Sequence, residues 1–197
     1  MPEPFFKLLS GVDPVSESLG NMTQGIGFPL RAVEGGAATT LVIEALRAFS
    51  VVDQDPVGLG VSLQITFGAP QTTEWFDVDS AGNITCLVTD EYQVIGKFSV
   101  GRTGGVGESQ IYIRGLINGT PVSWSVHAIV DNARIEMPIT FMANITFTVG
   151  DVITFEVVRD TDGDDSGSLT AGNPSVVGWA DSPSASLVLS RFSTVVP

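Results

Sequence analysis

The sequence has little cysteine, histidine or basic charge, and each scarcity excludes a class of protein. Cys86 is the only cysteine among 197 residues, which excludes an internal disulfide and a zinc cluster built on thiolates. Nine basic residues stand against 22 acidic ones, and the formal net charge is −13. Because so acidic a chain repels a phosphate backbone, we expect no nucleic-acid partner. No apolar run approaches the ~20 residues of a membrane-spanning helix, so we expect no membrane partner either.

Residues that carry catalysis are equally scarce. His127 is the only histidine, and its strand-like apolar neighbours from Trp124 to Ile129 include no acidic residue, which predicts a structural role. A reactive Cys86 would need a base or cation beside it, whereas the apolar residues around it predict a small buried residue within a strand. Acid–base and nucleophilic catalysis both need such partners. We therefore expect no enzyme activity and no cofactor.

What the sequence does have is an apolar composition interrupted by turn residues. Hydrophobic residues make up 43% and charged residues only 16%, which is typical of a folded chain. From Thr39 onward, β-branched and aromatic runs end at turn residues at intervals of about ten, a pattern typical of a sandwich or barrel. The predicted strands are Leu41–Ser50, Leu59–Phe67, Glu74–Val78, Ile84–Val88, Tyr92–Val100, Gln110–Ile117, Val122–Val130, Ile139–Phe147, Val152–Arg159, Ser175–Trp179 and Ser186–Phe192. A helix over Thr39–Phe49 is an alternative to the first of these, and Asn118-Gly119 predicts a tight hairpin turn.

The first 37 residues differ from the rest of the chain. Glycine and proline occur so densely in them that no helix or strand of useful length fits. They nevertheless keep apolar residues that a solvated linker would lack, namely Phe5, Phe6, Leu8, Leu9, Ile26 and Phe28. We interpret residues 1–37 as an extended N-terminal arm anchored to a partner surface by these side chains, and residues 38–197 as one folded domain. The alternative is that the segment packs on its own domain.

Four sequence blocks occur in a characteristic order between residues 65 and 192. They are Phe76–Thr85 with its aspartate and turn glycine, the strand that ends in Ile117-Asn118-Gly119, the Gly-Asp turn in Val149–Ile153, and the closing strand in Ser184–Ser190. In this order they resemble the tumour necrosis factor and complement globular-head superfamily. The resemblance implies an all-β fold, an antiparallel jelly-roll sandwich that assembles as a homotrimer.

Jelly rolls of this shape also occur on bacteriophage particles, and Gly101-Arg102-Thr103-Gly104-Gly105 resembles the phage members. The resulting hypothesis is a non-enzymatic bacteriophage virion structural protein on the capsid surface. As a capsid decoration (cement) protein, it would bind the major capsid protein and stabilise the shell as a trimeric knob. A fibre would need a shaft of heptads or repeats, which this sequence lacks.

The alternative function is a receptor-binding fibre tip or adhesin domain. In that case Trp75, Trp124 or Trp179 would contact host surface carbohydrate, and the tryptophan concerned must present a ring face to water. A secreted signalling domain, like the animal members of the superfamily, would need an export signal, and we expect none in the first ten residues.

An acidic segment between two predicted strands has the alternate spacing of calcium ligands. Asp160, Asp162 and Asp164 are placed so that a loop could wrap a hard cation. Two other loop positions depart from the calcium pattern, because Asp165 replaces the usual glycine and Ala171 replaces a bidentate glutamate. We therefore expect a solvated acidic loop without a high-affinity metal, with weak calcium binding as the alternative.

Overall fold

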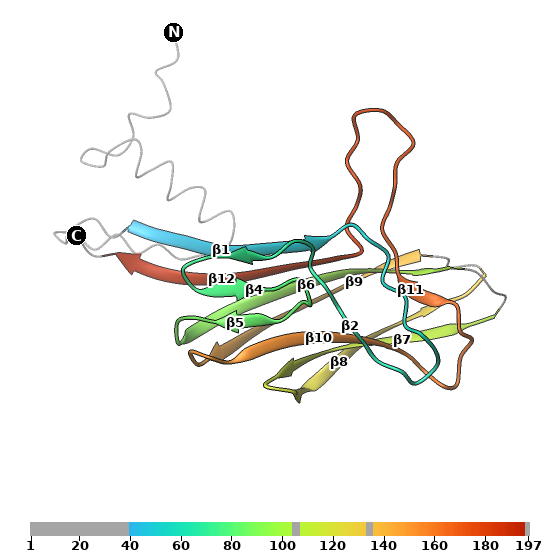
Figure 1. The fold of residues 1–197 in the computed structure, drawn as a ribbon, viewed down its shortest axis with the longest axis horizontal. Helices are drawn as coiled ribbons and strands as arrows, with labels where there is room; N and C mark the ends of the chain where they lie inside the picture. Colours follow the sequence, from blue (N-terminus) through green and yellow to red (C-terminus); the bar gives the residue numbers. More distant parts are fainter. Residues whose placement is uncertain (1–39, 104–106, 133–135, 196–197) are drawn as a thin grey trace, which may run out of the picture. The chain divides into compact units, whose positions relative to one another are not determined.

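The computed structural model describes residues 40–103, 107–132 and 136–195, and these form two antiparallel β-sheets (Figure 1). The long strands lie within a compact unit, Leu41–Thr194. The strands are β1 (Thr40–Ser50), β2 (Leu63–Gln64), β3 (Gln71–Thr72), β4 (Phe76–Val78), β5 (Ile84–Cys86), β6 (Asp90–Arg102), β7 (Ser109–Ile117), β8 (Thr120–Val130), β9 (Glu136–Phe147), β10 (Val152–Arg159), β11 (Gly167–Leu169) and β12 (Ala185–Val195). Among the described residues, no helix is long and apolar enough to cross a membrane.

The strand order is that of a jelly roll. In one sheet β1 pairs with β12, β12 with β6, and β6 with β9, while β11 extends the β12 edge of β6. In the other sheet β5, β10, β7 and β8 follow one another, flanked by the short strands β4, β3 and β2. Among the described strands, the chain passes from one sheet to the other six times, between β1 and β2, β5 and β6, β6 and β7, β8 and β9, β9 and β10, and β10 and β11, as in a pair of Greek keys. The predicted fold class, an all-β antiparallel jelly-roll sandwich, is confirmed.

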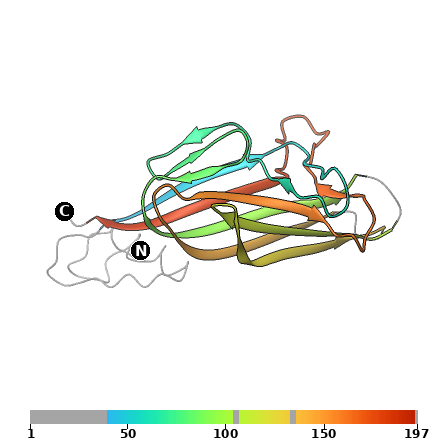
Figure 2. The ribbon, with the colours of Figure 1, turned by 60° about the horizontal axis from the view of Figure 1, so that its bottom comes forward.

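The core lies between the two sheets and follows from side-chain alternation. Along β10, Ile153, Phe155 and Val157 are buried while their neighbours are half-buried. The ring of Phe155 lies 5.8 Å from that of Phe67 and 5.6 Å from that of Phe141, measured between centroids. Each such side chain contributes about 1.5–3 kcal/mol on burial. The long strands of both sheets run in nearly the same direction (Figures 1 and 2), as in an aligned sandwich.

The burial pattern of β1 decides between the strand and the helix that the sequence allows over Thr39–Phe49. Leu46 and Ala48 are buried, whereas Arg47 and Phe49 are exposed. Burial therefore repeats every second residue, which is the period of a strand, and the helix alternative is wrong.

Two turns hold the register of the second sheet. Asn118 and Gly119 have φ angles of 51° and 75°, which confirms the predicted hairpin between β7 and β8. Between β4 and β5, the Asp79 carboxylate accepts N–H groups from Ala81 and Asn83. Gly82 in that turn has a φ of 88°, and a Cβ there would lie 2.2 Å from the Ile65 carbonyl oxygen. This explains why the aspartate and glycine of the first sequence block occur together.

One predicted strand, Ser175–Trp179, is wrong. These residues form an exposed turn in the long loop between β11 and β12, which projects away from the sheets (Figure 1). Pro174 and Gly178 favour turns, and the apolar side chains of Val176 and Val177 have no neighbouring strand to cover them. The predicted strand Leu59–Phe67 shortens to β2, and the short strands β3 and β11 were not predicted.

Candidate functional site

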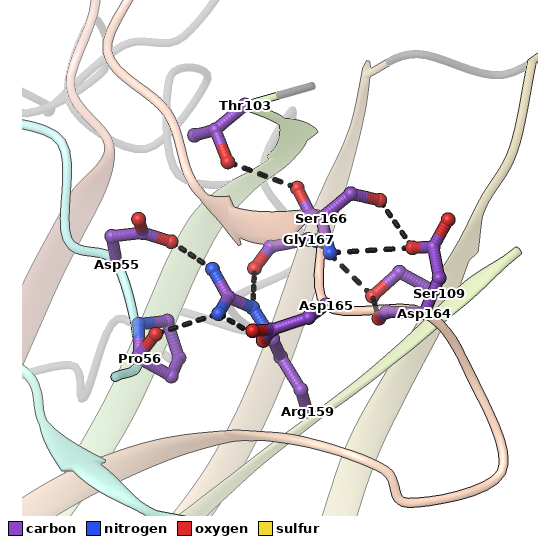
Figure 3. A network of polar contacts seen from close by, with 9 residues as sticks. All are labelled: Asp55, Pro56, Thr103, Ser109, Arg159, Asp164, Asp165, Ser166 and Gly167. Carbon is purple, nitrogen blue, oxygen red and sulfur yellow. Dashed lines mark hydrogen bonds and ion pairs between the residues drawn. The ribbon is translucent and has the colours of Figure 1, made fainter. Parts of the chain in front are cut away.

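Arg159, at the end of β10, holds three segments of chain together (Figure 3). Its side chain is 3% exposed and forms ion pairs with Asp55 and Asp165. The guanidinium also donates to the carbonyl oxygen of Pro56, at 2.6 Å, and to that of Gly167. These partners place the segment before β2, the acidic loop and the start of β11 around one buried cation. All three guanidinium nitrogens thus donate to groups of the protein.

The acidic loop 160–166 is more closely bound to the domain than a solvated loop would be. The Asp164 carboxylate accepts a hydrogen bond from the Ser166 hydroxyl and lies 3.3 Å from the Arg102 guanidinium. The Ser109 hydroxyl donates to the Asp164 main-chain oxygen at 2.9 Å (Figure 3). Only Asp162 and Asp165 have exposed side chains among its acids, and Ser166 is buried. The loop connects β10 to β11 with part of its residues exposed to water, and two arginines and a serine also hold it to the domain.

The three candidate metal ligands have separate surroundings. Asp160 accepts the main-chain N–H of Asp162 at 3.1 Å, while Asp164 faces Arg102 and Ser166. Across the part of the chain that the structure describes, no three His, Cys, Asp or Glu side chains are grouped to hold a metal ion. Arginine side chains supply the positive charge at this loop.

The three tryptophans differ in exposure. Trp75 and Trp124 are half-buried and pack against the core, and the Trp124 ring lies 4.6 Å from that of Phe141. Trp179 is 74% exposed on the projecting loop between β11 and β12. It borders an open hollow of about 400 Å³, whose other lining residues are Gly172, Asn173, Pro174, Ala180 and Ser182. Of the three, Trp179 is the one placed to present a ring to a ligand.

A second hollow lies on the outer face of the β5-β10-β7-β8 sheet. It has a volume of about 360 Å³ and is lined by Gly60, Ser62, Tyr112, Arg114, Ser125, Glu156, Val157 and Val158. The strand register places Glu156, Arg114 and Ser125 in one row across the sheet, and Val158, Tyr112 and His127 in the next. We call this hollow the outer groove. The sequence analysis did not predict it, because it requires knowledge of the pairing between β10 and β7.

The outer face of the other sheet is apolar along its middle. Val188 of β12 lies opposite Ile95 of β6, which lies opposite Met142 of β9. Met142 is 68% exposed, and Phe49 is exposed on β1 of the same sheet. The rows on either side contain Ser190, Gln93 and Asn144, and Ser186, Lys97 and Thr140. These three rows of β12, β6 and β9 form the centre of the outer face of the β1-β12-β6-β9 sheet and contain no carboxylate.

Cys86 and His127, the two remaining candidates for a catalytic role, have different positions in the fold. Cys86 is buried in β5, as expected, and burial raises the pKa of its thiol, which donates to the Val88 carbonyl oxygen at 3.0 Å. His127 is exposed, and its ring stacks on Tyr112 with centroids 5.4 Å apart. His127 is thus a surface residue beside the outer groove, next to the lining residue Tyr112. The predicted arm anchors, Phe5, Phe6, Leu8, Leu9, Ile26 and Phe28, lie outside the described residues.

The chain is similar to known proteins at the level of structure. No family model matches its sequence, and no curated protein matches it either. Its structural neighbours include murine APRIL, at 9% identity and a TM-score of 0.46, with 76% of this chain and 99% of that chain covered. They also include the globular domain of zebrafish complement 1qA protein, at 11% identity and a TM-score of 0.38, with 76% and 94% covered. The sheet pairing itself, rather than these likenesses, establishes the jelly-roll fold.

Proposed function

We propose that the protein is a non-enzymatic structural component of a bacteriophage virion, a capsid decoration protein that attaches to the capsid surface as a homotrimeric jelly-roll knob. The N-terminal arm binds the major capsid protein, and the jelly roll covers the joint between neighbouring capsid subunits. This combination of an apolar, glycine-rich arm and one compact β-unit suits a protein that clamps a shell.

The main support for a trimer is the apolar centre of the outer face of the β1-β12-β6-β9 sheet. Met142, Ile95 and Val188 form a continuous apolar row across three strands. Apolar side chains in a row on a sheet lose contact with water when a second copy packs on them, at about 25 cal/mol for each Å². A sheet face of this kind is the surface that a trimer would bury.

Charge supports the same face. Three copies of a chain with a net charge of −13 repel one another, so the contact must lie where carboxylates are absent. Among the described residues of β12, β6 and β9, Lys97 is the one charged side chain in the three central rows of this face. On the other sheet, in contrast, a central row includes Glu156, which is paired with Arg114.

A pair of matched variants tests this surface. Met142→Glu places a carboxylate in the apolar row of each subunit, and we expect the trimer to dissociate to monomers in sedimentation velocity. Ser123→Glu adds the same charge at an exposed position on β8 of the other sheet and should leave the trimer intact. Dissociation of both variants, or of neither, would place the subunit contact elsewhere.

The capsid attachment has its own test. A chain without residues 1–30 should keep the melting temperature of the full chain and fail to pull down the major capsid protein. If the shortened chain unfolds, or binds as well as the full chain, the arm does not anchor the protein.

A second candidate function is a receptor-binding fibre tip or adhesin domain that contacts host carbohydrate. Trp179 favours it, because this ring is exposed beside the polar side chains of Asn173 and Ser182 on a projecting loop. Trp179→Ala should then abolish attachment to host cells while leaving the melting temperature unchanged.

A further inference from the structure

We infer that the outer groove on the β5-β10-β7-β8 sheet is a binding site for a neutral saccharide. The inference is independent of the trimer and of the capsid, because the groove lies on the opposite sheet from the proposed subunit contact. It is also a different site from Trp179, with which it shares no lining residue. Its volume of about 360 Å³ falls within the ~300–1,000 Å³ range of small-ligand sites.

The groove is lined by a donor and an acceptor that are not used within the described part of the protein. Arg114 donates from Nε and Nη2 to the same oxygen of Glu156, Oε2, at 3.0 and 2.8 Å. Within the described part of the chain, the Nη1 group of Arg114 and the Oε1 oxygen of Glu156 have no hydrogen-bond partner. The ion pair therefore leaves one donor group of Arg114 and one acceptor oxygen of Glu156 available to a ligand. A sugar hydroxyl both donates and accepts, so it fits such a pair.

Hydroxyl groups and one aromatic ring complete the lining. Ser62 and Ser125 contribute side chains on two sides of the Arg114–Glu156 pair, and Tyr112 adds a half-buried ring. His127 stacks on Tyr112 with an interplanar angle of 20°, which restricts the rotation of the tyrosine ring. A restricted aromatic side chain among polar groups suits a sugar ring, which has both C–H and O–H edges.

Charge selects a neutral ligand over an ionic one. The two charged residues of the groove, Arg114 and Glu156, neutralise each other. An anionic ligand would have to displace Glu156 from Arg114 and would approach a protein with a net charge of −13. A cationic ligand would have to displace Arg114 from Glu156. A neutral polyol needs neither displacement.

Binding of neutral trisaccharides to the full-length protein tests the inference. The probes are maltotriose and triacetylchitotriose, measured by saturation-transfer NMR and titration, and we expect at least one to bind. Ser125→Tyr fills the groove from an exposed strand position and should abolish binding, and Arg114→Ala should weaken it about tenfold. Ser123→Tyr adds the same ring two residues along β8, outside the groove lining, and should bind as the natural protein does.

The outcomes separate this site from the proposed function. Met142→Glu should bind the saccharide as before even when it no longer forms trimers. Absence of binding to the natural protein, or equal binding by Ser125→Tyr with an unchanged melting temperature, would overturn the inference. Loss of binding in Trp179→Ala alone would assign the saccharide to the projecting loop and would overturn it as well.

Discussion

Arg159 is the residue that we expect to contribute most to the stability of the segments around the acidic loop. Its guanidinium is buried, whereas the carboxylates of Asp55 and Asp165 are half exposed to water. When the arginine is removed, these acids stay hydrated, but the buried carbonyl oxygens of Pro56 and Gly167 lose their donor. The cost therefore arises from unsatisfied carbonyls more than from unpaired acids.

We expect Arg159→Met to lower the free energy of unfolding by about 2–4 kcal/mol in urea denaturation. The matched control is Arg114→Met, which breaks an ion pair whose arginine is about half exposed, and it should cost under about 1 kcal/mol. Equal losses in the two variants would show that the buried network does not stabilise the fold.

Two surface aspartates set the stability of the turns in acid. Hydrogen bonds from Asn83 lower the pKa of Asp79 below its ordinary value of 3.8, and hydrogen bonds from Thr148 and Asn118 do the same for Asp151. A lowered pKa in the folded state means that the unfolded chain takes up protons first as the pH falls. The stabilisation is complete above the unfolded pKa and is lost as the pH falls through the folded pKa.

The melting temperature should therefore stay level from pH 7 to pH 5 and fall below about pH 4. Asp151→Asn should lower the melting temperature at pH 7 and make its decline in acid less steep. A variant whose decline in acid is as steep as that of the natural protein would assign the acid sensitivity to other groups.

At the scale of the element, β6 is the central strand of its sheet. It pairs with β9 along one edge and with β12 and β11 along the other. Gly96 lies on its inner face, where a Cβ would come within 2.2 Å of the Phe141 ring. That ring packs against Trp124 and Phe155, so it has no space into which to move.

Gly96→Ala should accordingly destabilise the protein by about 1–3 kcal/mol. Gly58→Ala is the control, because a Cβ there meets nothing within 4 Å, and it should change stability by less than about 0.5 kcal/mol. Thermal melts of both variants decide the point. A stable Gly96→Ala would mean that the two sheets can separate locally at little cost.

The acidic loop provides a second prediction at this scale. Arg102 and Arg159 already neutralise Asp164 and Asp165, so calcium has little charge left to relieve. Calorimetric titration should therefore detect no micromolar binding of calcium. A rise of many degrees in the melting temperature between chelator and millimolar calcium would show instead that Asp160, Asp162 and Asp164 form a structural site.

The sequence predicts most long strands because their side chains alternate or are β-branched. It also predicts the β7–β8 hairpin, since Asn118 and Gly119 are suited to positive φ. The strand β11 could not be predicted, because Gly167, Ser168 and Leu169 are held by pairing with β6 rather than by local preference. The predicted strand Ser175–Trp179 is wrong for the opposite reason. Val176 and Val177 favour a strand locally, but no described strand lies beside them to pair with.

The candidate sites depend still more on long-range pairing. Asp164 was singled out as a metal ligand by its local spacing, and only the fold brings Arg102 to it. The outer groove joins Arg114 and Glu156, which are 42 residues apart in the chain. The contact between Arg114 and Glu156 is set by the register of β7 against β10, which the sequence pattern does not specify.

At the scale of the whole molecule, the centre of one sheet face combines apolar side chains with little charge. The chain is strongly acidic, yet three central rows on one sheet contain no carboxylate and include the exposed side chain of Met142. Acidic charge elsewhere opposes association through other surfaces, while the central rows without carboxylates allow copies to associate. The proposed trimer follows from this distribution of charge.

Sedimentation equilibrium of the natural protein at micromolar concentration tests that central claim most directly. The account predicts a single species with three times the mass of the chain, unchanged on dilution within the micromolar range. A stable monomer would contradict the proposed assembly, and a stable dimer would exclude its threefold symmetry.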